Sequence, residues 1–210
     1  MKSRYLNSEE IAAIFKKMPV EKRLIFEIAL ETGLRIGDVL KIKKRDISAA
    51  PNGRCEVRFL AEKTKKKSIA FVESPAVAKK LLNQPKGYKG YIFASLKSKS
   101  GHITRQAAWK WFKTAAKEAK IDIDGCSPHS LRKSFATELM HRKGLAAVQS
   151  ALQHTNSFTT AIYAYADAYA GAAPESPILW GQINELLDLI LKRINGENLL
   201  KMDETPQKKG

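Results

Sequence analysis

The chain has 210 residues, of which 44% are hydrophobic and 28% charged, and its formal net charge is +16. This composition is typical of a globular domain large enough for one core. The sequence contains no run of 18 apolar residues, so no membrane span is predicted. The N-terminus lacks the apolar segment of a secretion signal. Cys55 and Cys126 are too few for a disulfide framework or a zinc site, which fits a protein of the reducing cytoplasm.

The positive charge is unevenly distributed along the chain. Residues 1–169 carry a net charge of +17, whereas residues 170–210 carry −1. A basic body of this kind indicates a polyanion partner, most commonly nucleic acid. Charge alone also fits an ordinary basic protein, so the assignment depends on the motifs below.

The first forty residues predict three helices. The apolar spacing indicates one helix capped by Ser8 and a second that ends at Gly33. A short helix is expected over 34–42, with Arg35 at the junction. A solvated arginine is the plainer interpretation, but the helix dipole at this point favours anions. Arg35 is better explained if a phosphate also binds there.

A β-hairpin is predicted next. Residues 55–60 and 68–72 form its strands, and the basic turn between them reads Lys63-Thr64-Lys65-Lys66-Lys67. Lysines at a hairpin tip usually protect a sheet edge in solvent; the alternative is a flexible finger that places one ammonium group on a phosphate. Residues 48–53 predict a loop, and 91–93 either a third strand or an extended link.

The second half of the chain predicts helices that carry polar side chains. Thr104 caps a helix from Arg105 to Lys120, and Arg105 and Gln106 at its start could reach base edges or phosphates. A further helix begins at Pro128 and ends near Gly144.

The segment that begins with this last helix contains the highest density of side chains that could bind or attack a phosphate. His129 and Arg132 are three residues apart and therefore share a helical face. A short helix over 146–152 is expected next, and His154 and Tyr163 follow it.

These groups suit attack on a phosphodiester. The transition state gathers negative charge on the free phosphate oxygens, which fixed cations and donors must stabilise in the absence of a metal. Arginine remains charged and grips two oxygens at once. A tyrosine hydroxyl, with a reference pKa near 10, ionises far more easily than a serine hydroxyl, and a lysine could protonate the leaving oxygen.

Four motifs, in this order and spacing, resemble the tyrosine recombinases of the phage integrase family. They are Thr32-Gly33-Leu34-Arg35-Ile36-Gly37-Asp38, His129-Ser130-Leu131-Arg132, Leu152-Gln153-His154-Thr155, and Tyr163 nine residues after His154. Ile103-Thr104-Arg105-Gln106 is similar to the chromosome-dimer resolvases of that family, and Gln153 replaces the family's usual glycine. The resemblance covers roughly residues 5–170 and implies a mainly α fold with a small antiparallel sheet (α+β).

The resemblance implies a role for each position. The implied catalytic residues are Arg35, Lys63, His129, Arg132, His154 and the nucleophile Tyr163, and the implied DNA-binding residues are Lys65, Lys66, Lys67, Thr104, Arg105 and Gln106. The two arginines and His154 would hold the scissile phosphate, and His129 would assist proton transfer from Tyr163. Lys63 would protonate the 5′ oxygen, with Lys65 and Lys66 as rivals. A 3′-phosphotyrosyl link conserves the bond energy, so no metal, ATP or other cofactor is expected.

The implied activity is site-specific recombination of double-stranded DNA with inverted-repeat sites, as in integration, excision, inversion or dimer resolution of mobile elements. A monomer in solution and a homo-tetramer on DNA are implied. Type IB topoisomerase-like relaxation and a non-catalytic DNA-binding regulator are the alternatives.

The expected domain organisation is a catalytic domain over 1–173, an amphipathic helix over 174–200 and a disordered tail over 201–210. The amphipathic helix packs either on its own domain or on a neighbouring protomer. The N-terminal DNA-clamping domain of most members is not expected, which fits a short subgroup of inversion enzymes, an excised fragment, or a protein that has lost full recombination.

Overall fold

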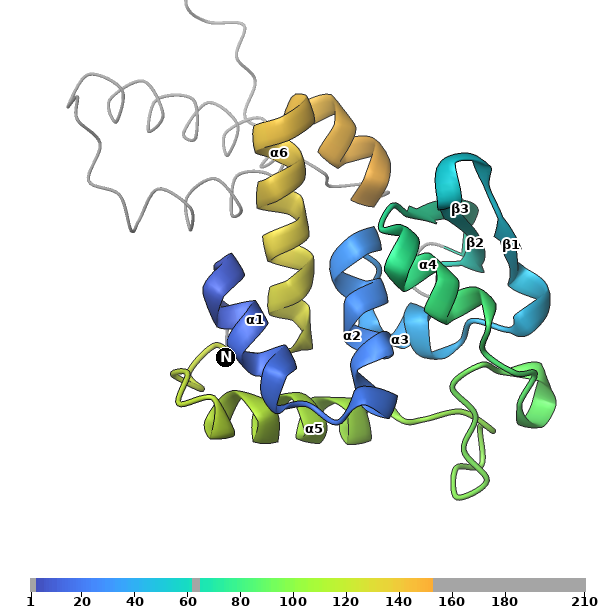
Figure 1. Cartoon of the computed structure of the whole chain (residues 1–210), viewed down its shortest axis with the longest axis horizontal. Helices are drawn as coiled ribbons and strands as arrows, with labels where there is room; N and C mark the ends of the chain where they lie inside the picture. The colour runs from blue at the N-terminus through green and yellow to red at the C-terminus, as the bar shows by residue number, and fades with distance from the viewer. Residues whose placement is uncertain (1–2, 62–64, 153–210) are drawn as a thin grey trace, which may run out of the picture. The chain divides into compact units, whose positions relative to one another are not determined.

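The computed structural model describes residues 3–61 and 65–152, all within one compact unit of the chain. Figure 1 shows their arrangement. The elements are α1 (Ser8–Lys17), α2 (Val20–Thr32), α3 (Ile36–Leu40), β1 (Ile47–Ala49), β2 (Cys55–Leu60), β3 (Lys67–Val72), α4 (Pro75–Leu82), α5 (Arg105–Glu118) and α6 (Pro128–Leu152), with single 3-10 turns at Lys44–Asp46, Pro51–Gly53 and Tyr88–Gly90. The predicted α+β class, mainly helical with a small antiparallel sheet, is therefore confirmed.

Local sequence determines where the first two helices begin and end. Asn7, rather than Ser8 as predicted, caps α1: its side chain accepts from the Glu10 backbone at 2.8 Å, and the Glu10 carboxylate accepts from the Asn7 backbone at 3.0 Å. This reciprocal pair satisfies two amide donors at the start of the helix. Gly33 ends α2 in the left-handed region, with φ of +64°, as predicted.

The sheet has the strand order β1-β2-β3, and both pairs are antiparallel. The β2–β3 hairpin is as predicted, but the third strand is Ile47–Ala49, part of which was expected to be a loop. Tyr91 makes only an isolated bridge to Lys43, so 91–93 is an extended link rather than a strand. A three-residue strand is too short to show an alternating pattern in sequence.

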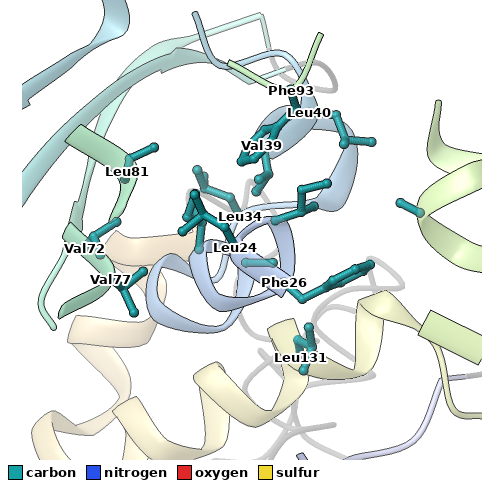
Figure 2. Close-up of a cluster of buried hydrophobic side chains, with 14 of the residues drawn as sticks. Leu24, Phe26, Leu34, Val39, Leu40, Val72, Val77, Leu81, Phe93 and Leu131 are labelled. Atoms are coloured by element: carbon teal, nitrogen blue, oxygen red, sulfur yellow. The ribbon is translucent and has the colours of Figure 1, made fainter. Parts of the chain in front are cut away.

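The core lies where α2 meets the sheet, α4 and α6. Figure 2 shows the side chains of Phe26, Val72, Leu81 and Leu131 converging in this cluster. Phe26 also meets Phe112 of α5, with ring centroids 5.3 Å apart. Burying one such side chain contributes about 1.5–3 kcal/mol, so α2 is held firmly between the sheet and the α5–α6 side.

The N-terminal segment fastens the start of α6 to the body. Arg4 pairs with the Glu10 carboxylate at 2.7 Å and donates to the Asp122 carbonyl at 3.2 Å. The Ser134 hydroxyl of α6 accepts from the Leu6 backbone N–H and donates to the Leu6 carbonyl. These contacts fix α6 and the loop before it against α1.

Helix α6 bends sharply at Gly144, as Figure 1 shows. The Gly144 φ of +75° interrupts the helical backbone, which confirms the predicted helix end and the short helix after it. The bend sets the last part of α6, from the residue after Gly144 to Leu152, at an angle to the first part. No helix among the described residues is long and apolar enough to cross a membrane.

Candidate active site

Arg132 lies at the centre of the site. It is on α6 and is only 4% exposed. Its guanidinium donates to the carbonyl of Gly33 and, at 3.0 Å, to the carbonyl of Leu152. Arg132 therefore ties the α2–α3 junction to the end of α6, two regions far apart in the sequence.

Gly33 is required at this junction for two reasons. Its positive φ is strained for residues with a side chain, and a Cβ there would lie 2.3 Å from the Phe135 ring and 3.0 Å from Leu152. The absence of a side chain lets the backbone approach α6 closely enough for its carbonyl to accept from Arg132.

Arg35 lies two residues after Gly33 and forms the N-cap position of α3. The pKa of Arg132 is lowered to about 10, mainly by burial and in addition by the positive charge of Arg35, while the Asp38 carboxylate acts in the opposite direction. Arg132 therefore remains charged at neutral pH. The structure thus brings the two predicted phosphate-binding arginines into electrostatic contact, although 97 positions separate them in the chain.

His129 lies one turn before Arg132 on α6, and its side chain is exposed. Desolvation by the surrounding protein nevertheless lowers its pKa, and the charges of Arg132, Lys133 and Arg35 act in the same direction. The imidazole is therefore mostly neutral at pH 7, the form that accepts a proton.

The predicted DNA-binding residues lie at two places on the surface. Lys65, Lys66 and Lys67 are exposed beside the hairpin tip, where the Lys65 amide donates to the Ala61 carbonyl at 2.8 Å and the Ala61 amide donates to the Lys66 carbonyl at 3.0 Å. These bonds close the base of the turn.

The second group is at the start of α5. Thr104 caps the helix by accepting from the Ala107 backbone at 3.2 Å, as predicted. Arg105 and Gln106 are both exposed in its first turn.

A recess of about 880 Å³ extends from α5 to His129 at the start of α6. Its lining includes Ser3, Ile36, Arg105, Gln106, Trp109, Lys110, Lys113, Gly125, Cys126, Ser127, Pro128 and His129. Trp109, Lys110 and Lys113 were not among the predicted contact residues. The four-residue steps from Arg105 to Trp109 and Lys113 would have indicated a common face.

Lys63, His154 and Tyr163 lie outside the described residues, as do the segments 174–200 and 201–210. Their predicted roles remain predictions. Within 3–61 and 65–152, no three His, Cys, Asp or Glu side chains are grouped so that they could hold a metal ion.

The sequence model of the phage integrase family matches residues 4–169. The chain belongs to the phage integrase family. Among curated relatives, this integrase-family chain is 29% identical over 177 residues to the tyrosine recombinase XerD of Corynebacterium glutamicum, covering 78% of the chain and 57% of the relative. It is 30% identical over 166 residues to XerC of Erythrobacter litoralis, covering 77% and 51%. The chain thus spans about half the length of the curated relatives it matches.

Solved structures of integrase-family proteins share the fold. The XerH recombinase in a post-cleavage complex with difH DNA gives a TM-score of 0.67 at 22% identity, covering 83% of this chain and 54% of that one. The catalytic domain of bacteriophage HP1 integrase gives 0.59 at 19% identity, covering 84% and 98%. The predicted catalytic-domain fold of the tyrosine recombinases is confirmed.

Proposed function

We propose that this chain is the catalytic part of a site-specific DNA recombinase that breaks and rejoins DNA through a covalent 3′-phosphotyrosyl intermediate. The observation that carries the proposal is the convergence of Arg35, His129 and Arg132 from two helices that are distant in sequence. Burial is the main reason that the pKa of Arg132 is lowered, and repulsion by the positive charge of Arg35 adds to it. A dianionic transition state on a phosphate relieves that repulsion, so the site is built for an anion.

Each residue then has a chemical role in the strand break. Arg35 and Arg132 hold the non-bridging oxygens of the scissile phosphate, with His154 as a further donor. The neutral His129 accepts the proton of the Tyr163 hydroxyl, whose oxygen forms the new bond to phosphorus. The 5′ oxygen leaves with a proton from Lys63, or from Lys65 or Lys66 as alternatives.

The reverse step rejoins the DNA. A 5′ hydroxyl from the partner strand attacks the phosphotyrosine and returns the tyrosine to its starting state. One phosphodiester forms for each one broken, so the cycle needs neither ATP nor a metal.

The DNA partner and its assembly follow from the same proposal. Relatives support it: XerH has been solved on difH DNA, and lambda integrase as a tetramer on a Holliday junction, with a TM-score of 0.58 at 21% identity. We propose that this chain acts on double-stranded inverted-repeat sites, as a monomer in solution and a tetramer on DNA. The basic residues of the hairpin and of α5 would then bind the phosphates on either side of the cut.

A nicked suicide substrate tests the proposal. The substrate is a duplex with a candidate inverted-repeat site taken from the DNA around the gene, with a nick that lets the leaving fragment diffuse away. We expect wild type to form a protein–DNA adduct that survives denaturing gels, Tyr163→Phe to form none, and Tyr165→Phe to retain it. Adduct formation by Tyr163→Phe would refute the assigned nucleophile, and binding without any adduct would favour a non-catalytic regulator. Relaxation of plasmid lacking the repeats would favour a topoisomerase.

A further inference from the structure

Trp109 is an anomaly on the surface of α5. The helix packs Ala108, Phe112 and Ala115 into the core, and its outward positions should therefore be polar. Trp109 nevertheless points outward with 51% of its surface exposed. The next aromatic residue, Trp111, is half-buried and packs under the Lys22 ammonium, 4.9 Å from the ring centre.

The position of Trp109 aligns it with DNA-binding candidates. Arg105, Trp109 and Lys113 are four residues apart and form one stripe along the helix. All three line the recess of about 880 Å³ that also reaches His129 at the start of α6. A polynucleotide bound near His129 could therefore also contact the Trp109 ring.

Lys113 holds the ring in place. Its ammonium lies 5.5 Å from the Trp109 ring centre and also donates to the Ile123 carbonyl in the loop before α6. A cation over an indole face is attractive, and the second contact fixes the ammonium itself. The Lys113 ammonium thus restrains the indole before any ligand binds, which lowers the conformational entropy lost on binding.

The chemistry of the stripe identifies its ligand. A 14-residue helix such as α5 fits the major groove of B-DNA. Arginine and glutamine recognise polar base edges there, but an exposed indole carbon surface needs an apolar partner. The thymine 5-methyl is the apolar group that the base pairs present in that groove.

We propose that Trp109 contacts the 5-methyl group of a thymine in the major groove and so determines sequence preference beside the cut. The inference deepens the proposed function, since it names how the same DNA substrate is recognised. Arg105 and Gln106 in the first turn of α5 read polar edges of neighbouring pairs, while Trp109 reads the methyl group. Trp109 touches no reacting atom and acts on specificity alone.

Photo-crosslinking with 5-iododeoxyuridine tests the contact. The iodine replaces the thymine methyl, so irradiation joins that position to an aromatic ring in contact with it. The full chain is incubated with a random-sequence duplex pool in which every thymidine is replaced, then irradiated and digested, and the adduct peptide is sequenced. We expect the adduct on Trp109, its loss in Trp109→Leu, and its retention in the matched control Trp111→Phe.

A second measurement removes only the methyl group. Duplex pools made with deoxyuridine in place of thymidine should bind wild type about fourfold more weakly, the effect of one buried methyl group. Trp109→Leu should bind both pools with nearly equal affinity. An adduct at other residues, an adduct only with single-stranded pools, or equal methyl dependence in wild type and Trp109→Leu would overturn the inference.

These outcomes are separable from failure of the proposed function. Neither measurement requires DNA cleavage, whereas the proposed function fails if wild type forms no covalent adduct on the nicked substrate. A chain that forms the phosphotyrosyl adduct but crosslinks elsewhere would refute only the role of Trp109. A chain that binds no duplex at low salt would contradict both.

Discussion

Arg132 combines a structural contact with a charge that the chemistry needs. Its guanidinium binds the Gly33 and Leu152 carbonyls and is almost fully buried. Burial and the charge of Arg35 lower its pKa to about 10, which still leaves it protonated at pH 7. The proposed mechanism thus relies on a residue whose removal should also loosen the fold, and the two effects must be measured separately.

The variant Arg132→Lys separates the effect on catalysis from the effect on stability. A lysine retains the charge but replaces the planar fork with a single ammonium, which cannot reach both carbonyls as arginine does. We expect a loss of about 1.5–3 kcal/mol in the free energy of unfolding, measured in urea. Under conditions where the variant is folded, adduct formation should fall about 100-fold or more. Unchanged stability would show that the carbonyl contacts contribute little.

The proposed role of His129 as a proton acceptor predicts that the activity depends on pH. Because the pKa of His129 is lowered from the ordinary value near 6.5, the imidazole becomes protonated only at a lower pH than a free histidine. It therefore stays neutral, and able to accept a proton, over a wider pH range. The rate of adduct formation should hold through pH 6.5 and fall only at lower pH, as the imidazole becomes protonated. The same depressed pKa predicts that the stability contributed by neutral His129 is present above pH 6.5 and is lost as the pH falls through the folded-state value.

The measurement for His129 is the pH–rate profile of single-turnover adduct formation, with His129→Gln as the comparison. The variant should lose the acidic limb and react more slowly throughout. A wild-type limb centred above 6.5, or an unchanged limb in the variant, would show that another group titrates.

At the scale of elements, the site depends on two helix breaks. Gly33 ends α2 and Gly144 bends α6, with φ of +64° and +75°. A Cβ on Gly33 would strike the Phe135 ring, whereas nothing lies within 4 Å of a Cβ on Gly144. Gly33 has the left-handed helical conformation, with ψ of 10°, whereas Gly144 has ψ of −179°, a combination that is essentially restricted to glycine. The two glycines therefore differ both in backbone conformation and in packing.

Alanine substitution at the two glycines compares these effects. Gly144→Ala should cost about 1–3 kcal/mol from its backbone conformation alone, and the left-handed backbone of Gly33 should cost an alanine about 1–2 kcal/mol. Gly33→Ala should cost about 1–3 kcal/mol more, because the ring of Phe135 must also move. Urea unfolding of the two variants measures both values, and adduct formation should fall further in Gly33→Ala. A total loss of no more than about 2 kcal/mol in Gly33→Ala, the cost of the left-handed backbone alone, would contradict the close-packing role of Gly33.

Much of this architecture is predictable because its signals are local. The Gly33 stop, the Thr104 cap, the 55–60 strand and the break at Gly144 all follow from residue type and spacing. The β1 strand was missed since three residues show no period, and the cap at Asn7 was misplaced by one position.

The motifs of the sequence nominated candidate site residues, but they carried no information on the geometry of the site. Motif spacing identified Arg35, His129 and Arg132, and the structure brings them together. The partners of Arg132 are backbone carbonyls, which leave no mark in residue identity, and its burial depends on tertiary packing. Trp109 was overlooked because an aromatic residue in a helix is normally assigned to the core.

The whole molecule is a basic body followed by a nearly neutral tail. A net charge of +17 over residues 1–169 suits a polyanion, and the apolar spacing of 174–200 predicts a helix that needs a partner surface. We propose that this helix packs on a neighbouring protomer when the chains assemble on DNA.

Deleting residues 174–210 tests that assembly. We expect the truncated protein to retain its melting temperature and its binding to a single repeat, and to lose the multi-protomer complex on paired repeats. Native gels and light scattering measure the assembly, and calorimetry measures the melting. Intact assembly together with a destabilised monomer would place the helix on its own domain.

The central claim is that Arg35 and Arg132 act on the scissile phosphate through their charge, and a neutral methylphosphonate at that position tests it directly. Arg35→Ala is the suitable variant, because no hydrogen bond from the Arg35 side chain to a described residue would be lost. Adduct formation by Arg35→Ala should be about 100-fold slower than wild type on the natural phosphate. The account predicts that the neutral substrate restores most of that loss, because no second cation is then required. An equal defect on both substrates would contradict it.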